Sequence, residues 1–108
     1  MLIKEKDIAS VGKVKALDKN QVSKRLKELP GWELKEGKLE RVIQFKDFAQ
    51  AMVFVNQLAE LAEKENHHPD FSVFSWNKVK ISLYTHDVNG LSEKDFILAA
   101  KISELLKI

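Results

Sequence analysis

Hydrophobic residues recur at three- and four-residue spacing in three stretches of the chain, as they do in helices that bury one face. The spacing predicts helices over roughly 19–29, 47–66 and 93–107. Each helix is preceded by a residue type that often caps a helix N-terminus, and these residues are Asp18, Asp47 and Ser92. Pro69 disfavours helical backbone in the residue before it, so the long middle helix is expected to end near Asn66.

Polar and apolar residues alternate between these helices, which is typical of strands that bury one face. Short strands are expected at 32–34 and 39–45, and a second pair is expected at 71–76 and 79–86, with a tight turn at Asn77-Lys78. Both links are short, so each pair is predicted to be antiparallel.

The predicted order of elements is helix, strand, strand, helix, strand, strand, helix (α-β-β-α-β-β-α). It favours an α+β domain in which three helices pack on one face of a four-stranded antiparallel sheet. Residues 1–16 show no clear period and carry scattered lysines, so we interpret them as an N-terminal extension to a domain over 17–108. A sheet covered on one side leaves its other face or an edge open, which favours a homo-oligomer.

Composition narrows the class of protein. The 108 residues, 44% hydrophobic and 31% charged, fit one ordinary globular domain. A net charge of +2 is too small to indicate a nucleic acid or a membrane surface as a partner. The chain has no cysteine, which excludes disulfides, thiolate metal sites and a cysteine nucleophile. It also has no apolar run near the roughly 18 residues of a membrane-spanning helix and no signal-peptide core, so a cytoplasmic location is expected.

The three histidines, His67, His68 and His86, lie in one short part of the chain. Histidine changes charge near physiological pH, which suits acid–base catalysis or metal binding. Glu63 and His67 are four residues apart and are expected to share a face at the end of the middle helix. His86 is expected either to point away from the core or to lie just past its strand, and both positions leave it available to a ligand. Two imidazoles on opposite sides of a small molecule could act as acid and base in an elimination.

Each of these residues also has a purely structural interpretation. Glu63 could be a solvated glutamate on a helix flank. His67 and His68 could cap the C-terminus of the helix, where positive charge is favoured. His86 could be a single exposed histidine at a strand end.

Three further residues and a rival chemistry bear on the site. Asp95 completes a Ser92-x-x-Asp95 capping box, which could be its main role. Trp32 and Trp76 are expected in the core or at an interface, although an aromatic wall would suit a flat heterocycle. The main rival chemistry is a zinc ion held by three histidines. Adjacent histidines splay apart in extended backbone, and the H-E-x-x-H spacing is absent.

Taken together, these residues resemble the signature of the pterin-4a-carbinolamine dehydratases, also called 4a-hydroxytetrahydrobiopterin dehydratases. The similarity covers about residues 17–108. The matching positions are Leu29-Pro30-Gly31-Trp32, Glu63-x-x-x-His67-His68-Pro69, Trp76, Thr85-His86 and Gly90-Leu91-Ser92-x-x-Asp95.

The resemblance implies a homodimer or homotetramer that dehydrates 4a-hydroxytetrahydropterin to quinonoid dihydropterin, in tetrahydrobiopterin recycling, without a cofactor or a metal. It implies that three residues are catalytic, namely His67, His68 and His86. It also implies three substrate-binding or supporting residues, namely Glu63, Asp95 and Trp76. Two alternatives stay open. One is dehydration of another pterin, from a molybdopterin or folate-related pathway, and the other is a non-catalytic binding or dimerisation module for a protein partner.

Overall fold

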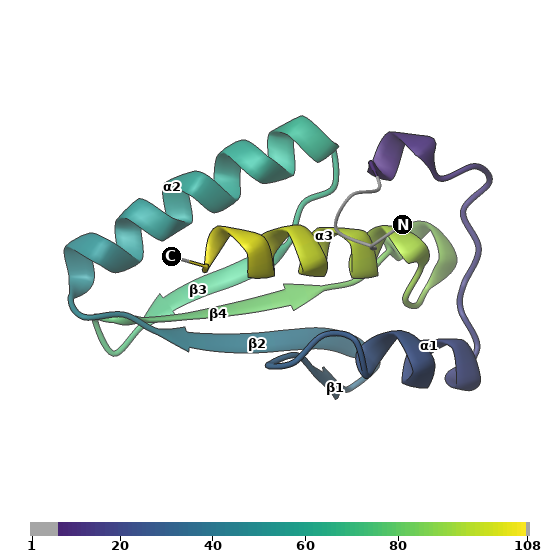
Figure 1. Ribbon diagram of the computed structural model, residues 1–108, viewed down its shortest axis with the longest axis horizontal. Coiled ribbons are helices and arrows are strands. Elements are labelled where there is room, and N and C mark those ends of the chain that lie inside the picture. The colour runs from purple at the N-terminus through teal and green to yellow at the C-terminus, as the bar shows by residue number, and fades with distance from the viewer. Residues whose placement is uncertain (1–6, 108) are drawn as a thin grey trace.

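The computed structural model of the protein describes residues 7–107. It contains the helices α1 (Lys19–Leu26), α2 (Phe48–Glu65) and α3 (Glu93–Leu105), the strands β1 (Glu33–Lys35), β2 (Lys38–Gln44), β3 (Asp70–Phe74) and β4 (Lys78–Leu83), and two short 3-10 helices, η2 (Ile8–Ser10) and η3 (His86–Val88) (Figure 1). The predicted order of helices and strands is confirmed.

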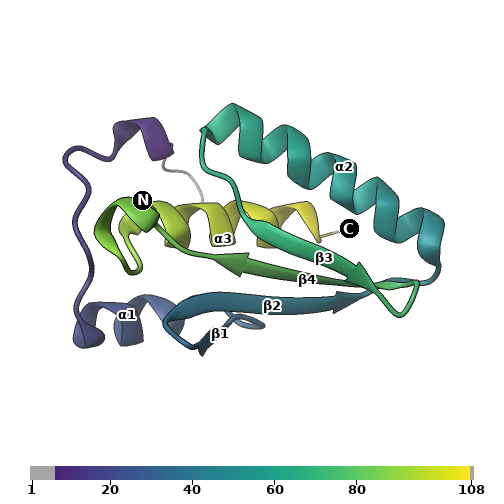
Figure 2. The ribbon, with the colours of Figure 1, turned by 180° about the vertical axis from the view of Figure 1, so that it is seen from behind.

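The four strands form one antiparallel sheet in the order β1-β2-β4-β3. Helices α2 and α3 pack against each other over one face of this sheet, as the opposite views in Figures 1 and 2 show. Helix α1 lies beside β1 at one end of the sheet and contributes Val22 to the same core. The α+β architecture expected from the two hydrophobic periods is therefore present.

Strand β4 runs through the interior of the sheet and buries alternate side chains under the helices. Val79, Ile81 and Leu83 are fully buried, whereas Lys80 between them is exposed on the other face. Helix α3 packs beside α2 and buries side chains all around its axis, namely Phe96, Ile97, Leu98, Ala99, Ala100 and Ile102. This packing fixes the face that β4 presents to the core, because slipping by one residue would expose its whole apolar set.

The turn between β3 and β4 begins two residues before the predicted turn at Asn77-Lys78 and includes Asn77, whereas Lys78 is the first residue of β4. Three residues separate the paired Phe74 and Lys78, and the first two of them, Ser75 and Trp76, are left-handed with φ of 46° and 55°. Asn77 looks like a turn residue, yet it is buried, and its amide Nδ2 donates to the carbonyl oxygen of Phe45 at 2.9 Å. The polar side chain therefore ties the hairpin to the end of β2.

Helix α1 ends at Leu26, three residues before the predicted end. The N–H groups of Glu28 and Leu29 donate to the carbonyls three residues earlier, so the last turn tightens into 3-10 geometry. This tightening directs Leu29 into the core just before the chain enters β1.

Trp32 belongs to the core, as expected for one of the two tryptophans. Its Nε1 donates to Oγ of Ser103 at 2.9 Å, and the guanidinium of Arg41 donates to the same oxygen at 3.0 Å. Burial lowers the pKa of Arg41. Gly31 has φ of 92°, and a Cβ there would lie 3.0 Å from Cζ of Arg41, so the backbone conformation and the close approach both favour glycine.

The described part of the predicted N-terminal extension packs on the rest of the fold. Ile8 in η2 is only 4% exposed and belongs to the hydrophobic core. Residues 1–6 of the extension lie outside the described residues. The segment from residue 7 onward therefore contributes to folding, although its single buried residue gives no recognisable period in the sequence.

Candidate active site

The site begins where α2 ends. Asn66 adopts the left-handed conformation, with φ of 52°, and the N–H of His67 donates to the carbonyl oxygen of Ala62 at 3.2 Å. This helix ending satisfies the last carbonyls while turning the chain out of the helix. His67, His68 and Pro69 then form the link to β3.

His67 points toward the N-terminal end of α3. Its Nε2 lies 2.8 Å from Oδ1 of Asp95, a carboxylate that is fully buried. The other oxygen, Oδ2, accepts hydrogen bonds from Oγ1 of Thr85 at 2.7 Å and from the backbone N–H of Ser92 at 3.0 Å. The bond from Ser92 is the helix-capping contact expected for Asp95. One carboxylate therefore supports the start of α3 and also holds His67.

This arrangement determines how His67 can act. A carboxylate oxygen accepts hydrogen bonds, so we assign Nε2 of His67 as the donor in this contact. No described residue makes a hydrogen bond to Nδ1 of His67. A carboxylate on one ring nitrogen fixes the tautomer and leaves the other nitrogen to exchange a proton with a ligand.

His86 directly follows Thr85, whose hydroxyl donates to Asp95. Strand β4 ends at Leu83, so of the two predicted positions for His86 the one past the strand is observed. Thr85 and Gly90 exchange backbone hydrogen bonds and close a small loop, with His86 at its exposed start. The ring of Tyr84 meets the ring of His86 edge to face at a centroid distance of 5.0 Å. Because Thr85 also donates to Asp95, that carboxylate anchors both the loop of His86 and the side chain of His67.

Glu63 and His68 form a second, exposed pair through Oε2 and Nε2. The expected sharing of a helix face by Glu63 and His67 does not occur, because α2 ends at Glu65 and His67 lies beyond the helix. The four-residue spacing holds only while both residues are helical. Glu63 therefore supports His68 instead of His67.

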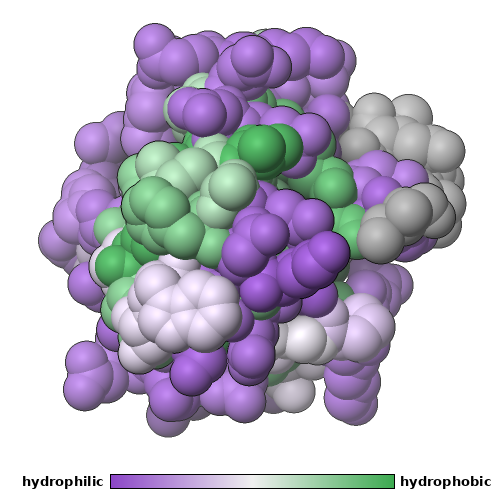
Figure 3. Space-filling model, turned by 90° about the vertical axis from the view of Figure 1, so that its left-hand side faces the viewer, coloured by the Kyte–Doolittle hydropathy of each residue, from purple (hydrophilic) through white to green (hydrophobic). Residues whose placement is uncertain are grey.

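Trp76 does not lie with the histidines within one chain. It occupies the β3–β4 turn, while His68 precedes β3 and His86 follows β4 at the opposite end of the hairpin. A five-residue strand spans about 17 Å. The Trp76 side chain is 62% exposed at an end of the molecule where hydrophobic side chains reach the surface (Figure 3).

The contact of Ser92 with Asp95 was predicted as a capping contact, whereas Thr85 was not predicted to contact the site. A signal for Thr85 was present, because it shares the parity of the buried residues of β4. Its hydroxyl is buried and lies 2.7 Å from Oγ of Ser92 as well as from Asp95. A hydroxyl continuing a buried apolar set indicates an internal hydrogen bond, since buried polar groups are almost always paired.

No group of three histidine, aspartate or glutamate side chains among residues 7–107 is arranged to hold a metal ion. Within the same residues, no helix is long and apolar enough to cross a membrane.

Comparison with known proteins identifies the family to which the sequence is similar. The family model described as pterin 4 alpha carbinolamine dehydratase matches residues 15–105. A curated relative from Acidobacterium capsulatum, which its name assigns to the pterin-4-alpha-carbinolamine dehydratases, is 49% identical over 85 residues, covering 79% of this chain and 91% of the relative.

Two solved structures are also similar. The transcriptional coactivator/pterin dehydratase from Brucella melitensis is 33% identical, with a TM-score of 0.80 over 85% of this chain and 99% of that chain. A pterin dehydratase-like protein described as a RuBisCO assembly factor in the alpha-carboxysome is 28% identical, with a TM-score of 0.57 over 68% of this chain and 84% of that chain. The family match spans both the helix end with its histidines and the carboxylate that holds them: the chain belongs to the pterin-4-alpha-carbinolamine dehydratase family.

Proposed function

We propose that the protein dehydrates a 4a-hydroxytetrahydropterin to the quinonoid dihydropterin by histidine acid–base catalysis, as the recycling step of tetrahydrobiopterin. The observation that carries the proposal is the contact between His67 and the buried carboxylate of Asp95. Family membership supplies the reaction class. No cofactor or metal takes part in the proposed reaction.

The elimination needs two proton transfers. The C4a–O bond breaks as its hydroxyl gains a proton and leaves as water. The neighbouring ring nitrogen loses a proton, and its electron pair forms the new carbon–nitrogen double bond. Positioned acids and bases typically contribute about 10²–10⁴-fold to such a step.

His67 and His86 are the proposed acid–base pair. Nδ1 of His67 exchanges the proton while Asp95 holds Nε2 and stabilises the imidazolium that forms, as a carboxylate does in other catalytic histidine pairs. The exposed ring of His86 supplies the second group. Which of the two acts as the acid depends on the face of the pterin that carries the hydroxyl.

His68 and Glu63 are proposed to contact and orient the pterin ring. Both side chains are exposed, and within residues 7–107 they are held by their contact with each other. Groups in this situation suit a binding role, because a bound ring would cover them and strengthen their interactions. Trp76 was also implied as a supporting residue, but its distance from the histidines favours a surface role.

The direct experiment measures dehydration of a synthetic 4a-hydroxytetrahydropterin by stopped-flow absorbance. Wild type, His67→Ala and His86→Ala are compared with Gln57→Ala, an exposed substitution on α2 that serves as a control. We expect acceleration by wild type and by the control, and a large loss in both histidine variants. A wild-type rate equal to the spontaneous rate would reject the proposed activity.

The physiological pterin could differ in the substituent on its ring, since the proposed residues address only the ring shared by biopterin, folate-related and molybdopterin compounds. Comparing kcat/KM for 4a-hydroxypterins with different side chains tests this alternative. A preference of about tenfold or more for a compound other than the biopterin would replace tetrahydrobiopterin recycling with that pathway.

A binding role is the second candidate function, favoured by similarity to the RuBisCO assembly factor. A purely non-catalytic binding module has no need for an imidazole held by a buried carboxylate. Affinity capture with wild type and His67→Ala distinguishes the two functions. A stoichiometric protein partner retained by an inactive His67→Ala variant would support a separate binding role.

Exposed apolar side chains support a homodimer or homotetramer. Phe71 and Phe74 lie on β3, which is an edge strand of the sheet and has one side free of pairing within the described chain. Exposed edges of this kind are commonly covered by a partner. Light scattering at several protein concentrations measures the size of the assembly. We also propose that the protein acts in the cytoplasm.

A further inference from the structure

A buried carboxylate lies two residues before His67. Glu65 is the last residue of α2, and its side chain is only 4% exposed. It continues the buried stripe of Leu58 and Ala62 at positions i, i+4 and i+7, so a charged group occupies an apolar face. A charge in such a position is costly unless it is paired and hydrogen-bonded.

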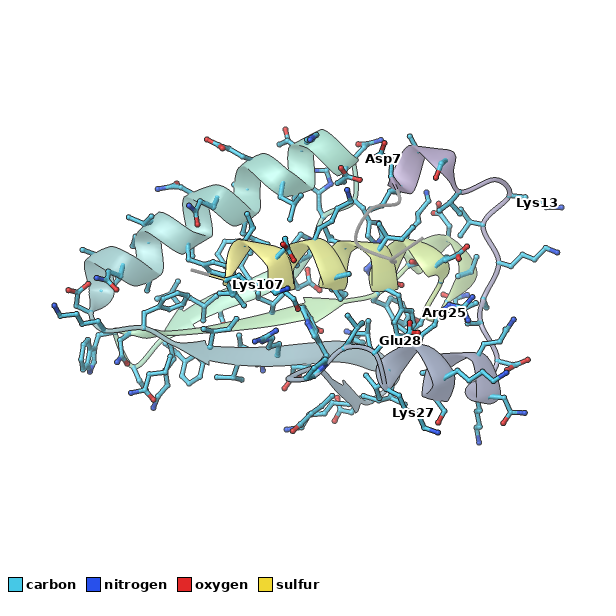
Figure 4. The ribbon with its side chains drawn as sticks, in the orientation of Figure 1. Asp7, Lys13, Arg25, Lys27, Glu28 and Lys107 are labelled. Atoms are coloured by element: carbon cyan, nitrogen blue, oxygen red, sulfur yellow. The ribbon has the colours of Figure 1, made fainter. Side chains whose placement is uncertain are left out.

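Three segments of the chain meet at Glu65. Oε1 accepts a hydrogen bond from the backbone N–H of Ile8 at 3.1 Å, and Oε2 lies 3.7 Å from Nζ of Lys101 on α3. Lys101 also lies 3.4 Å from the carboxylate of Asp7, which Figure 4 shows beside the end of α2. The N-terminal segment at residues 7–11, the end of α2 and the middle of α3 are therefore linked by polar contacts.

The same two helices position His67 and the carboxylate that holds it. His67 follows the end of α2, and Asp95 lies six residues before Lys101 on α3, about 9 Å along the helix axis. The contact of Glu65 with Lys101 therefore restrains the end of α2 against α3 close to the contact of His67 with Asp95. A displacement there would change the distance between Nε2 of His67 and the carboxylate that holds it.

The N-terminal segment covers this contact. Ile8 is buried against the core, and a pocket of about 430 Å³ is lined by Asp7, Ile8, Ala9 and Val11 together with Lys64, Glu65, Asn66 and Lys94. The N-terminal segment at residues 7–11 precedes the part of the chain matched by the family model, which begins at residue 15. The backbone donor of Ile8 is thus supplied from outside the matched region.

We propose that Glu65 is a positioning residue, which together with Lys101 and the N-terminal segment at residues 7–11 holds His67 in contact with Asp95. Its effect on dehydration rests on the proposed function, whereas its effect on the contact itself does not. Glu65 is not expected to touch the pterin.

The test uses the full chain with Glu65→Gln, which keeps an oxygen for the N–H of Ile8 but removes the charge that faces Lys101. The matched control is Glu60→Gln, which makes the same substitution at an exposed glutamate of α2. Two readouts are collected at a temperature at which circular dichroism shows the variants folded. They are kcat and KM for dehydration, and ¹⁵N–¹H NMR of the His67 ring.

We expect Glu65→Gln to lower kcat about tenfold with KM changed by less than about threefold, as small displacements in an active site do. The protected Nε2–H signal of His67 should weaken, and the Nδ1–H tautomer should appear. Glu60→Gln should retain both the kcat and the signal of wild type. A merely stabilising Glu65 would lower the melting temperature and leave kcat and the His67 signal unchanged, which would overturn the proposal.

Two further outcomes are distinguishable. If wild type does not accelerate dehydration, the proposed function fails, and the NMR comparison alone decides whether Glu65 positions His67. If Glu65→Gln does not fold, Lys101→Gln replaces it, since its amide can donate to Glu65 without carrying charge. The same weakening of the Nε2–H signal then supports the proposal, and an unchanged signal overturns it.

Discussion

Nε2 of His67 lies 2.8 Å from Oδ1 of Asp95, although the two residues are 28 positions apart in the chain. The carboxylate is fully buried, and its other oxygen accepts the hydroxyl of Thr85 and the N–H of Ser92. A buried carboxyl group with three hydrogen-bonding partners is rigid, because each partner would be costly to leave unpaired. His67 is therefore held by a group that is itself fixed in place.

Removing one donor should weaken this support. Thr85→Val keeps the shape of the side chain but removes the hydroxyl that donates to Asp95. We expect the free energy of unfolding to fall by about 1–3 kcal/mol, because the buried carboxylate loses a partner. Urea denaturation measures the change. Thr85→Ser, which keeps the hydroxyl, should retain more stability, and equal stability of Thr85→Val and wild type would contradict the importance of this bond.

The exposed pair should behave differently from the buried one. His68→Ala removes a proposed contact to the pterin ring, so KM should rise about tenfold, equivalent to ~1.4 kcal/mol of binding. The free energy of unfolding should change little, because exposed ion pairs such as Glu63–His68 contribute less than about 1 kcal/mol. Steady-state kinetics and urea denaturation give both quantities. A large fall in kcat with unchanged KM would assign His68 to proton transfer instead.

Trp76 provides a test of the site's extent. Because it lies at the opposite end of the hairpin from the histidines, Trp76→Ala should leave kcat and KM within about twofold of wild type. Light scattering on the same variant records any change in assembly. A strong increase in KM would show that Trp76 reaches a pterin site, which within an oligomer would have to be the site of a neighbouring copy.

The N-terminal segment should contribute to stability. Ile8→Ala removes a side chain that is 4% exposed, and we expect a loss of about 2–3 kcal/mol because a cavity remains. Lys13→Ala is a suitable control, since Lys13 is exposed and points away from the fold in Figure 4. Equal denaturation midpoints for both variants would mean that the segment is not docked in solution.

Much of the fold follows from local pattern. The spacing of hydrophobic residues predicts the buried side of β4, made by Val79, Ile81 and Leu83, and the buried residues of α2 and α3. This spacing depends only on the repeat of each element. The turn between β3 and β4 was predicted two residues too late, because Asn77 has turn propensity but its amide donates to the carbonyl oxygen of Phe45. Propensity cannot distinguish these uses of an asparagine side chain.

The composition of the candidate site was easier to predict than its connections. Clustering and motif spacing indicated the histidines and Asp95, whereas the pairing of His67 with Asp95 depends on how α2 packs against α3. The same dependence explains why Glu63 pairs with His68. The burial of Ile8 was not predicted, because one buried residue in an irregular segment produces no periodic signal.

The central claim is that His67, held by Asp95, transfers a proton during pterin dehydration. Its most direct test is the single-turnover dehydration rate of a synthetic 4a-hydroxytetrahydropterin with wild type, His67→Ala and Asp95→Asn, each shown to be folded by circular dichroism. We predict that the rate constant falls about 10²–10⁴-fold in both variants, because one lacks the imidazole and the other loses its tautomer. A folded His67→Ala variant that retains the wild-type rate would contradict the claim.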